Sequence, residues 1–98
     1  MKAVFFINPE NYSKVKSLVY ADDVVSRQTI NFREARALGL HKDGYYLEID
    51  GPNEAVHKAK EILGDLAKEA SGKEKEEFLK KIKAEEESAA EGFGSLFG

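Results

Sequence analysis

The stretch "YYLEIDGPNEAVHKAKEIL", residues 45–63, holds the two clearest elements of this chain. Its first six residues alternate in side-chain character, which predicts a strand with two unlike faces. After a turn at Gly51-Pro52, apolar residues recur at spacings of three and four, which predicts an amphipathic helix that continues to Ala70. A strand followed directly by a helix is typical of mixed α/β folds.

The apolar stripe of that helix has two interpretations. Its members are Val56, Ala59, Leu63, Leu66 and Ala70. The stripe can pack in the core of its own chain, or Val56, Leu63 and Leu66 can form a self-association face between two copies, since heptad-like spacing suits both uses. The spacing alone leaves both open.

The residues before this stretch predict further elements. The run "KAVFFIN", residues 2–8, reads as a mostly buried strand, and Pro9 can open a helix after it. Residues 22–30 read as extended, and "NFREARALGL", residues 31–40, predicts a short helix with Asn31 as its cap, Glu34 in a capping box and Gly39 at its end. The resulting β-α-β-α-β-α order predicts an α/β (α+β) two-layer sandwich, in which helices cover one face of a small sheet.

The domain organisation follows from a change in composition near residue 72. Residues 1–72 predict a small α/β sandwich domain, near the lower size limit for a self-sufficient core. Residues 73–98 are highly charged and favour helix, with few large apolar side chains. We therefore expect a charged helical linker and a flexible tail there.

Composition narrows the class of protein. The 98 residues contain no cysteine and carry a formal net charge of −3, which excludes a disulfide framework and argues against binding nucleic acid through bulk positive charge. No apolar run approaches the roughly eighteen residues that cross a bilayer. We expect a cytoplasmic protein without a membrane partner, and a Lys/Glu-rich composition of this kind is typical of a thermophile.

The inventory of reactive side chains is small. His41 and His57 are the only histidines, and no hydrolase, zinc-protease or phosphate-loop spacing occurs. We therefore expect no catalytic residues, no metal ligands and no cofactor, and we do not expect an enzyme.

Three arginines lie within ten residues of one another, at Arg27, Arg33 and Arg36, and Lys42 follows closely. Arginine matches phosphate oxygens, so these side chains are candidates for a contact with RNA or the ribosome. Nearby acidic residues offer the alternative that they form structural ion pairs. Both interpretations stay open at this stage.

Residues 45–63 are also similar to the final strand and helix of KH-type RNA-binding domains. That family clamps the nucleic-acid backbone with a GxxG loop, which this chain lacks, because its only closely paired glycines are Gly92 and Gly94. The resemblance implies an α/β sandwich. An RNA-binding module on it would depend on the arginines instead.

The carboxy-terminal end carries a second resemblance. "KAEEESAAEGFGSLFG", residues 83–98, resembles the factor-binding tail of the archaeal ribosomal stalk proteins, a Lys/Glu/Ala hinge that ends in a short apolar motif. In that family the tail inserts its apolar residues into a groove of translational GTPases and of the ribosome-recycling ATPase. By position, the binding residues are Gly92, Phe93, Leu96, Phe97 and Gly98. Phe93 stands where the family has leucine, and Gly94 departs from its pattern.

These observations favour an accessory, ribosome-associated translation protein of archaeal type, whose tail docks on translation factors. One version is a dimeric ribosome-silencing factor that prevents the joining of ribosomal subunits. The alternatives are a KH-like RNA-binding module that uses the arginine patch, and a structural homodimer whose tail is a packing arm. Partners would be the ribosome, translational GTPases, RNA or a second copy of the chain.

Overall fold

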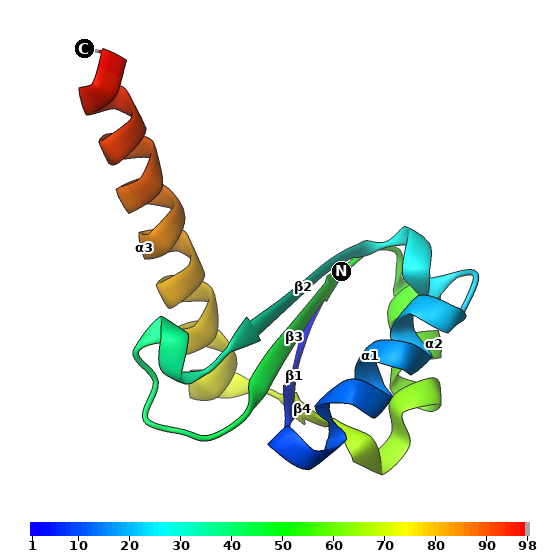
Figure 1. Cartoon of the computed structure of the whole chain (residues 1–98). Helices are drawn as coiled ribbons and strands as arrows, with labels where there is room; N and C mark the ends of the chain where they lie inside the picture. The colour runs from blue at the N-terminus through cyan, green and yellow to red at the C-terminus, as the bar shows by residue number, and fades with distance from the viewer. Residues whose placement is uncertain (98) are drawn as a thin grey trace.

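The computed structural model describes the backbone of residues 1–97 and the side chains of residues 1–87 (Figure 1). The strands are β1 (Lys2–Ile7), β2 (Thr29–Glu34), β3 (Tyr45–Asp50) and β4 (Lys68–Ala70). The α-helices are α1 (Tyr12–Ala21), α2 (Asn53–Leu63) and α3 (Gly72–Phe97). Short 3-10 turns occupy Pro9–Asn11, Val25–Arg27, Arg36–Leu38 and Gly64–Leu66. None of these helices is long and apolar enough to cross a membrane within the described part of the chain.

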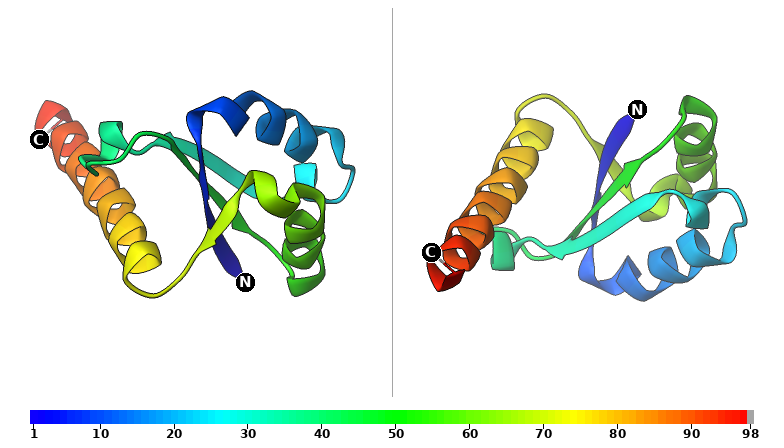
Figure 2. Two further views of the ribbon diagram at one scale, coloured as in Figure 1. Left: turned by 90° about the horizontal axis from the view of Figure 1, so that it is seen from below. Right: turned by 90° about the horizontal axis from the view of Figure 1, so that it is seen from above.

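The four strands form one antiparallel sheet in the order β2-β3-β1-β4. Up to β4 the succession is β-α-β-β-α-β, the split β-α-β arrangement. A mixed α/β fold is confirmed, but the predicted β-α-β-α-β-α succession is wrong, because β2 connects to β3 without an α-helix. Helices α1 and α2 cover one face of the sheet and α3 lies against the other, so helices occupy both faces rather than one (Figure 2).

Residues 22–40 differ most from the sequence-based expectation. The predicted helix over residues 31–40 is instead strand β2 followed by a single 3-10 turn, Arg36–Leu38. Ile30 and Phe32 pair directly with Ile49 and Leu47 of β3 and place their side chains on the face covered by α1. This long-range pairing outweighs the local capping signal at Asn31.

The predicted helix over residues 51–70 is also too long. Helix α2 ends at Leu63, because Gly64 takes a positive φ of 49°. The chain then makes one 3-10 turn and forms β4, in which Ala70 pairs with Val4 of β1. Residues 68–70 favour a helix locally but form an edge strand. If α2 were longer, the backbone groups on the free side of β1 would have no hydrogen-bond partners, and β4 supplies these partners.

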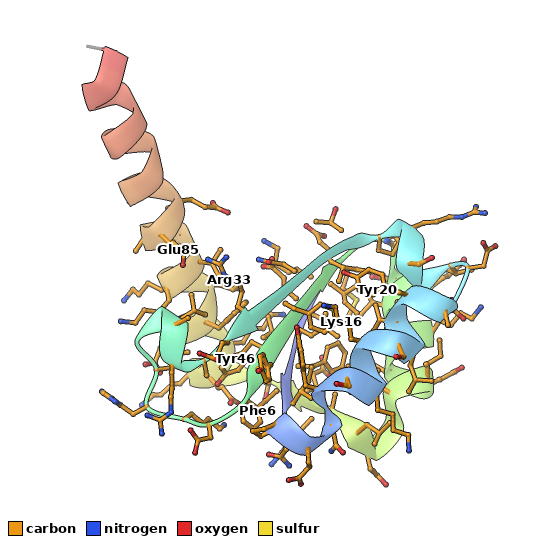
Figure 3. All side chains as sticks on the ribbon, viewed as in Figure 1. Phe6, Lys16, Tyr20, Arg33, Tyr46 and Glu85 are labelled. Atoms are coloured by element: carbon orange, nitrogen blue, oxygen red, sulfur yellow. The ribbon has the colours of Figure 1, made fainter. Side chains whose placement is uncertain are left out.

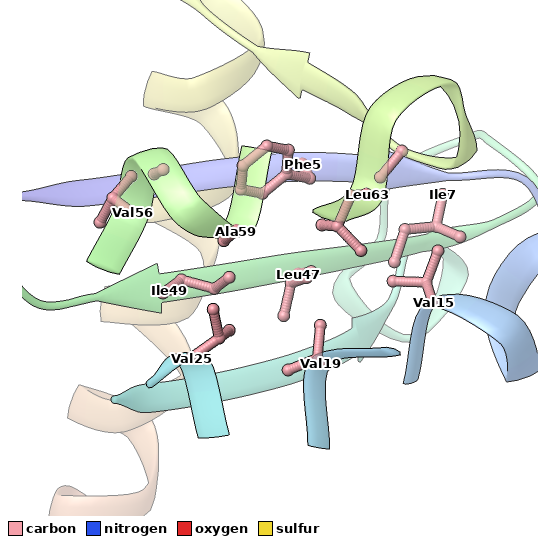
Figure 4. Packing of buried hydrophobic residues seen from close by; sticks show 12 residues of the cluster. Phe5, Ile7, Val15, Val19, Val25, Leu47, Ile49, Val56, Ala59 and Leu63 are labelled. Atoms are coloured by element: carbon pink, nitrogen blue, oxygen red, sulfur yellow. The ribbon is translucent and has the colours of Figure 1, made fainter. Parts of the chain in front are cut away.

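The main core lies between the sheet and the helices α1 and α2 (Figure 4). Its fully buried side chains come from both layers and are chiefly Ile7, Val15, Val19, Val25, Leu47, Ile49, Val56 and Leu63. Val56 and Leu63 therefore pack inside one chain and present no surface to a second copy. Leu66 is partly buried against the same cluster. Of the two interpretations of the α2 stripe, the packing supports the core.

A second, smaller core lies on the opposite face of the sheet. Phe78 and Ile82 of α3 are buried there against Val4, Tyr46 and Ala70. The first part of α3 is thus an integral part of the globule, although residues 73–82 were expected to belong to a linker. This arrangement stabilises a fold with a small sheet, because α3 covers a face that would otherwise expose aromatic and aliphatic side chains to water.

Candidate functional site

The candidate site is the α3 helix, which crosses the second face of the sheet and carries the carboxy-terminal tail. It follows directly from β4, and Lys75 Nζ donates a hydrogen bond of 2.8 Å to the Lys2 carbonyl of β1. Phe78 then packs on Tyr46 of β3, with 5.1 Å between ring centroids. Glu85 forms an ion pair with Arg33 of β2. The helix therefore runs from the β4 edge to the β2 edge, held by contacts with the strands between them.

A polar cluster fixes the first turn of α3. Glu74 Oε2 accepts hydrogen bonds of 2.9 Å from the Tyr46 hydroxyl and from Lys42 Nζ. Lys42 Nζ also lies 3.9 Å from the centroid of the Phe6 ring, which makes edge contact with Tyr46 (Figure 3). These contacts join β1, β3 and the loop before β3 to the beginning of α3.

The same cluster shifts two pKa values. Burial raises the pKa of Tyr46 well above its usual range, and the adjacent Glu74 carboxylate adds to that effect. Burial alone would raise the pKa of Glu74, but the hydrogen bonds from Lys42 and Tyr46 outweigh it and lower that pKa. At neutral pH, Glu74 is therefore an acceptor and Tyr46 a donor. The cluster therefore holds the first turn of α3 in place.

The ion pair between Arg33 and Glu85 is the last described contact between α3 and the sheet (Figure 3). Beyond it the helical backbone continues to Phe97 and projects away from the sheet (Figure 1). The predicted binding residues Gly92, Phe93, Leu96 and Phe97 lie on this projecting part. Their side chains fall outside the described residues, as does the whole of Gly98.

Each of the basic residues predicted to contact RNA has an acidic partner in the structure. Arg27 pairs with Asp23 at 3.2 Å and Arg36 with Asp43 at 2.5 Å. Arg33 pairs with Glu85, and Lys42 with Glu74 at 2.9 Å. The four cations lie on the turn before β2, on β2 itself and on the β2–β3 connection, and each has an acidic partner. This geometry matches the alternative of structural ion pairs.

A hollow of about 410 Å³ lies between α3 and the second face of the sheet. It is lined by Lys2, Glu48, Leu79, Ile82, Lys83 and Glu86. Glu48 is buried and lies 3.6 Å from Lys2 Nζ, so the two charges neutralise each other. Within the described residues, no three side chains of the kinds that bind metals come together.

Sequence reasoning missed an aromatic row along the β2 side of the molecule. Tyr12 of α1 stacks on Tyr45 at 3.8 Å between centroids and meets the edge of Phe32. Tyr20, two helical turns later, lies 6.1 Å from Phe32 between ring centroids. The eight-residue spacing of the two α1 tyrosines was the available signal, since it places both on one side of a helix.

Comparison of the chain with protein-family models, with curated proteins and with solved structures found no match.

Proposed function

We propose that this chain is an accessory translation protein that presents its carboxy-terminal segment to translation factors. The observation that carries the proposal is the way in which α3 is attached to the sheet. One end is fixed to the sheet by Phe78 and by the Glu74 cluster, and the other projects beyond it with the stalk-like motif (Figure 1). A binding segment at the projecting end of such a helix can enter a groove of another protein without disturbing the globule to which the helix is attached.

The chemistry of the segment supports the same function. Phe93, Leu96 and Phe97 stand at positions i, i+3 and i+4, the spacing by which a short helix places apolar anchors in a groove. The residues before them, from Lys83 to Glu87, are mostly charged, so the apolar group is confined to the very end. Translational GTPases, which stalk proteins bind through a similar segment, are the partners we propose.

The test measures how strongly three variants of the chain, each immobilised on a resin, capture a translational GTPase. These are the wild type, a variant that lacks residues 92–98, and the matched surface variant His57→Ser, which changes an exposed side chain of α2. The probe is a purified archaeal elongation GTPase in its GTP and GDP states. We expect the deletion to weaken binding by roughly 30-fold or more, since truncated anchor residues typically contribute at least 2 kcal/mol, and His57→Ser to have no effect.

Thermal unfolding of the same chains is the second readout. The deletion leaves every described residue of the two cores in place, so the Tm of the shortened chain should stay within about 2 °C of the wild type. Undiminished capture by the shortened chain would refute the proposal. A loss of several degrees in Tm would instead indicate that the tail packs on its own globule.

A further inference from the structure

Strand β2 is an open edge of the sheet. Its six residues pair with β3 in continuous register, without a bulge, and it contains neither proline nor glycine. The opposite edge of the sheet is protected, because β4 has only three residues. Beyond the end of β4, Lys75 Nζ donates a hydrogen bond to the Lys2 carbonyl of β1. A long regular edge with free backbone groups is a template for pairing with another strand.

Two hydrogen bonds identify which backbone groups of β2 face outward. Ala35 N–H donates to the Gly44 carbonyl over 3.0 Å and continues the β2–β3 ladder, so the odd-numbered residues of β2 bond to β3. Gly51 N–H donates to the Met1 carbonyl over 2.9 Å on the other side of β3, in agreement with this alternation. The N–H and C=O groups of Ile30, Phe32 and Glu34 therefore point away from the sheet. No hydrogen bond within the described residues reaches them.

Exposed apolar surface gathers beside the same edge. Tyr20 is 52% exposed and Val24 39% exposed, and they are two of the three large apolar side chains that the described residues leave exposed. Tyr20, labelled in Figure 3, lies next to Phe32 of β2. Val24 directly precedes the 3-10 turn Val25–Arg27 that leads into β2. A partner strand on this edge would cover apolar side chains as well as backbone groups.

We propose that two copies of the chain pair through β2, antiparallel about a two-fold axis at Asn31, and form one continuous sheet. The outward groups belong to even-numbered residues in both copies, so a symmetric pairing is centred on a residue and not between two residues. Asn31 and Phe32 are the two residues at the middle of the six-residue strand, and centring on one of them pairs the most residues. With Asn31 at the centre, Ile30 faces the partner's Phe32 on the α1 side. Centring on Phe32 would set the Glu34 carboxylate against the partner's Ile30.

The charges at the ends of the strand favour a second copy as the occupant. Arg27, whose side chain is 73% exposed, precedes β2, and the exposed Glu34 ends it. The proposed register places Glu34 opposite the partner's Gln28 and next to the partner's Arg27. The two-fold axis repeats that pair, so the edge is complementary to itself in backbone, apolar contact and charge.

The dimer has a defined architecture. The sheet has eight strands, four from each copy, with α1 and α2 of both copies on one face. Both α3 helices lie on the other face, because the axis is perpendicular to the sheet. Each chain therefore presents its carboxy-terminal segment on the same side of the assembly.

The absence of cysteine makes disulfide trapping a clean test. Asn31→Cys places two thiols at a non-hydrogen-bonded pair, where Cα atoms lie about 4.5 Å apart, within the range for a disulfide. We expect full-length Asn31→Cys to give a covalent dimer on mild oxidation. Lys68→Cys, on the exposed face of β4, is the matched control and should stay monomeric on a non-reducing gel.

Sedimentation equilibrium on full-length chains gives an independent readout. The wild type should have twice the chain mass of 10.9 kDa. Asn31→Lys sets two ammonium groups against each other at the axis and should give a monomer with an unchanged circular dichroism spectrum, since Asn31 is only half-buried. Deletion of residues 92–98 should leave the dimer intact, which separates this inference from the proposed function of the tail.

Three results would overturn the inference. The first is a wild-type chain that stays monomeric up to about 0.5 mM, well above the concentrations at which specific dimers form. The second is a dimer that persists in Asn31→Lys, which would place the interface elsewhere. The third is cross-linking of Lys68→Cys as readily as Asn31→Cys, which would reveal random collision.

Discussion

Tyr46 in the middle of the sheet donates its hydroxyl proton to Glu74 at the start of α3, over 2.9 Å. The two residues are 28 positions apart in the chain, and their contact joins β3 to the helix that carries the tail. Lys42 completes the arrangement from the loop before β3. Since both donors favour the ionised carboxylate, the position of α3 is coupled to the protonation of one side chain.

Glu74→Gln should therefore change the acid sensitivity of the fold. The pKa of Glu74 is lowered in the folded chain from its ordinary value of 4.5, so its stabilising effect is present above that pH and is lost as the pH falls through the lowered pKa. At pH 7 we expect Glu74→Gln to reduce the free energy of unfolding by ~1 kcal/mol, allowing for partial solvent screening. Below about pH 4 the difference from the wild type should shrink.

The measurement is urea unfolding between pH 3 and pH 7. Glu76→Gln, two residues further along and exposed, is the matched control and should follow the wild type at each pH. A difference between Glu74→Gln and the wild type that is constant across this range would contradict the coupling.

Phe78→Ala tests whether α3 belongs to the core. Phe78 is fully buried, so its truncation leaves a cavity and should reduce the free energy of unfolding by about 3–5 kcal/mol. Lys80→Ala, on the exposed side of the same helix, should change it by less than about 0.5 kcal/mol. Chemical denaturation followed by tyrosine fluorescence gives both values. Equal, small effects would mean that residues 73–82 are a linker after all.

Gly44→Ala tests the close approach of the β2–β3 connection to β1. Gly44 has a φ of 143°, and a Cβ there would lie 2.5 Å from Phe6 Cζ and 2.6 Å from the Ile7 carbonyl oxygen. We expect a loss of about 2–4 kcal/mol, from backbone strain and from a clash with an atom that cannot move aside.

Gly72→Ala is the matched control for that substitution. Gly72 also has a positive φ, of 58°, but a Cβ there meets nothing within 4 Å. Gly72→Ala should therefore lower the free energy of unfolding only by the cost of a left-handed backbone at alanine, roughly 1–2 kcal/mol. Thermal unfolding of both variants measures the difference, and a Gly72→Ala variant as unstable as Gly44→Ala would contradict the assignment to a clash.

The ion pair between Arg33 and Glu85 can be measured by a double-mutant cycle. Both side chains are partly exposed, so we expect a coupling free energy of only about 0.2–1 kcal/mol, which should fall as salt is added. The cycle uses Arg33→Ala, Glu85→Ala and the double variant in denaturant titrations at low and high salt. A coupling of zero at low salt would show that this contact does not hold α3 at the β2 edge.

Several elements could be predicted from the sequence, because their signals are local. The alternation of residues 45–50 and the apolar run at residues 2–7 match β3 and β1, and the repeat from Val56 to Leu63 matches α2. In each of these segments the pattern that directs side chains to the core agrees with the intrinsic preference of the residues. The tail motif was also visible in the sequence, and its role stays a prediction.

Only the tertiary structure decided the rest. Residues 31–34 carry a capping signal yet form a strand, and residues 68–70 favour a helix yet pair with β1, because free edges of the sheet supply hydrogen-bond partners that no local pattern encodes. The arginines are close in sequence, but folding gives each its own acidic partner. The sequence by itself determined which segments are apolar and periodic, while the packing determined which of them meet, since buried backbone groups and apolar faces must find partners from distant parts of the chain.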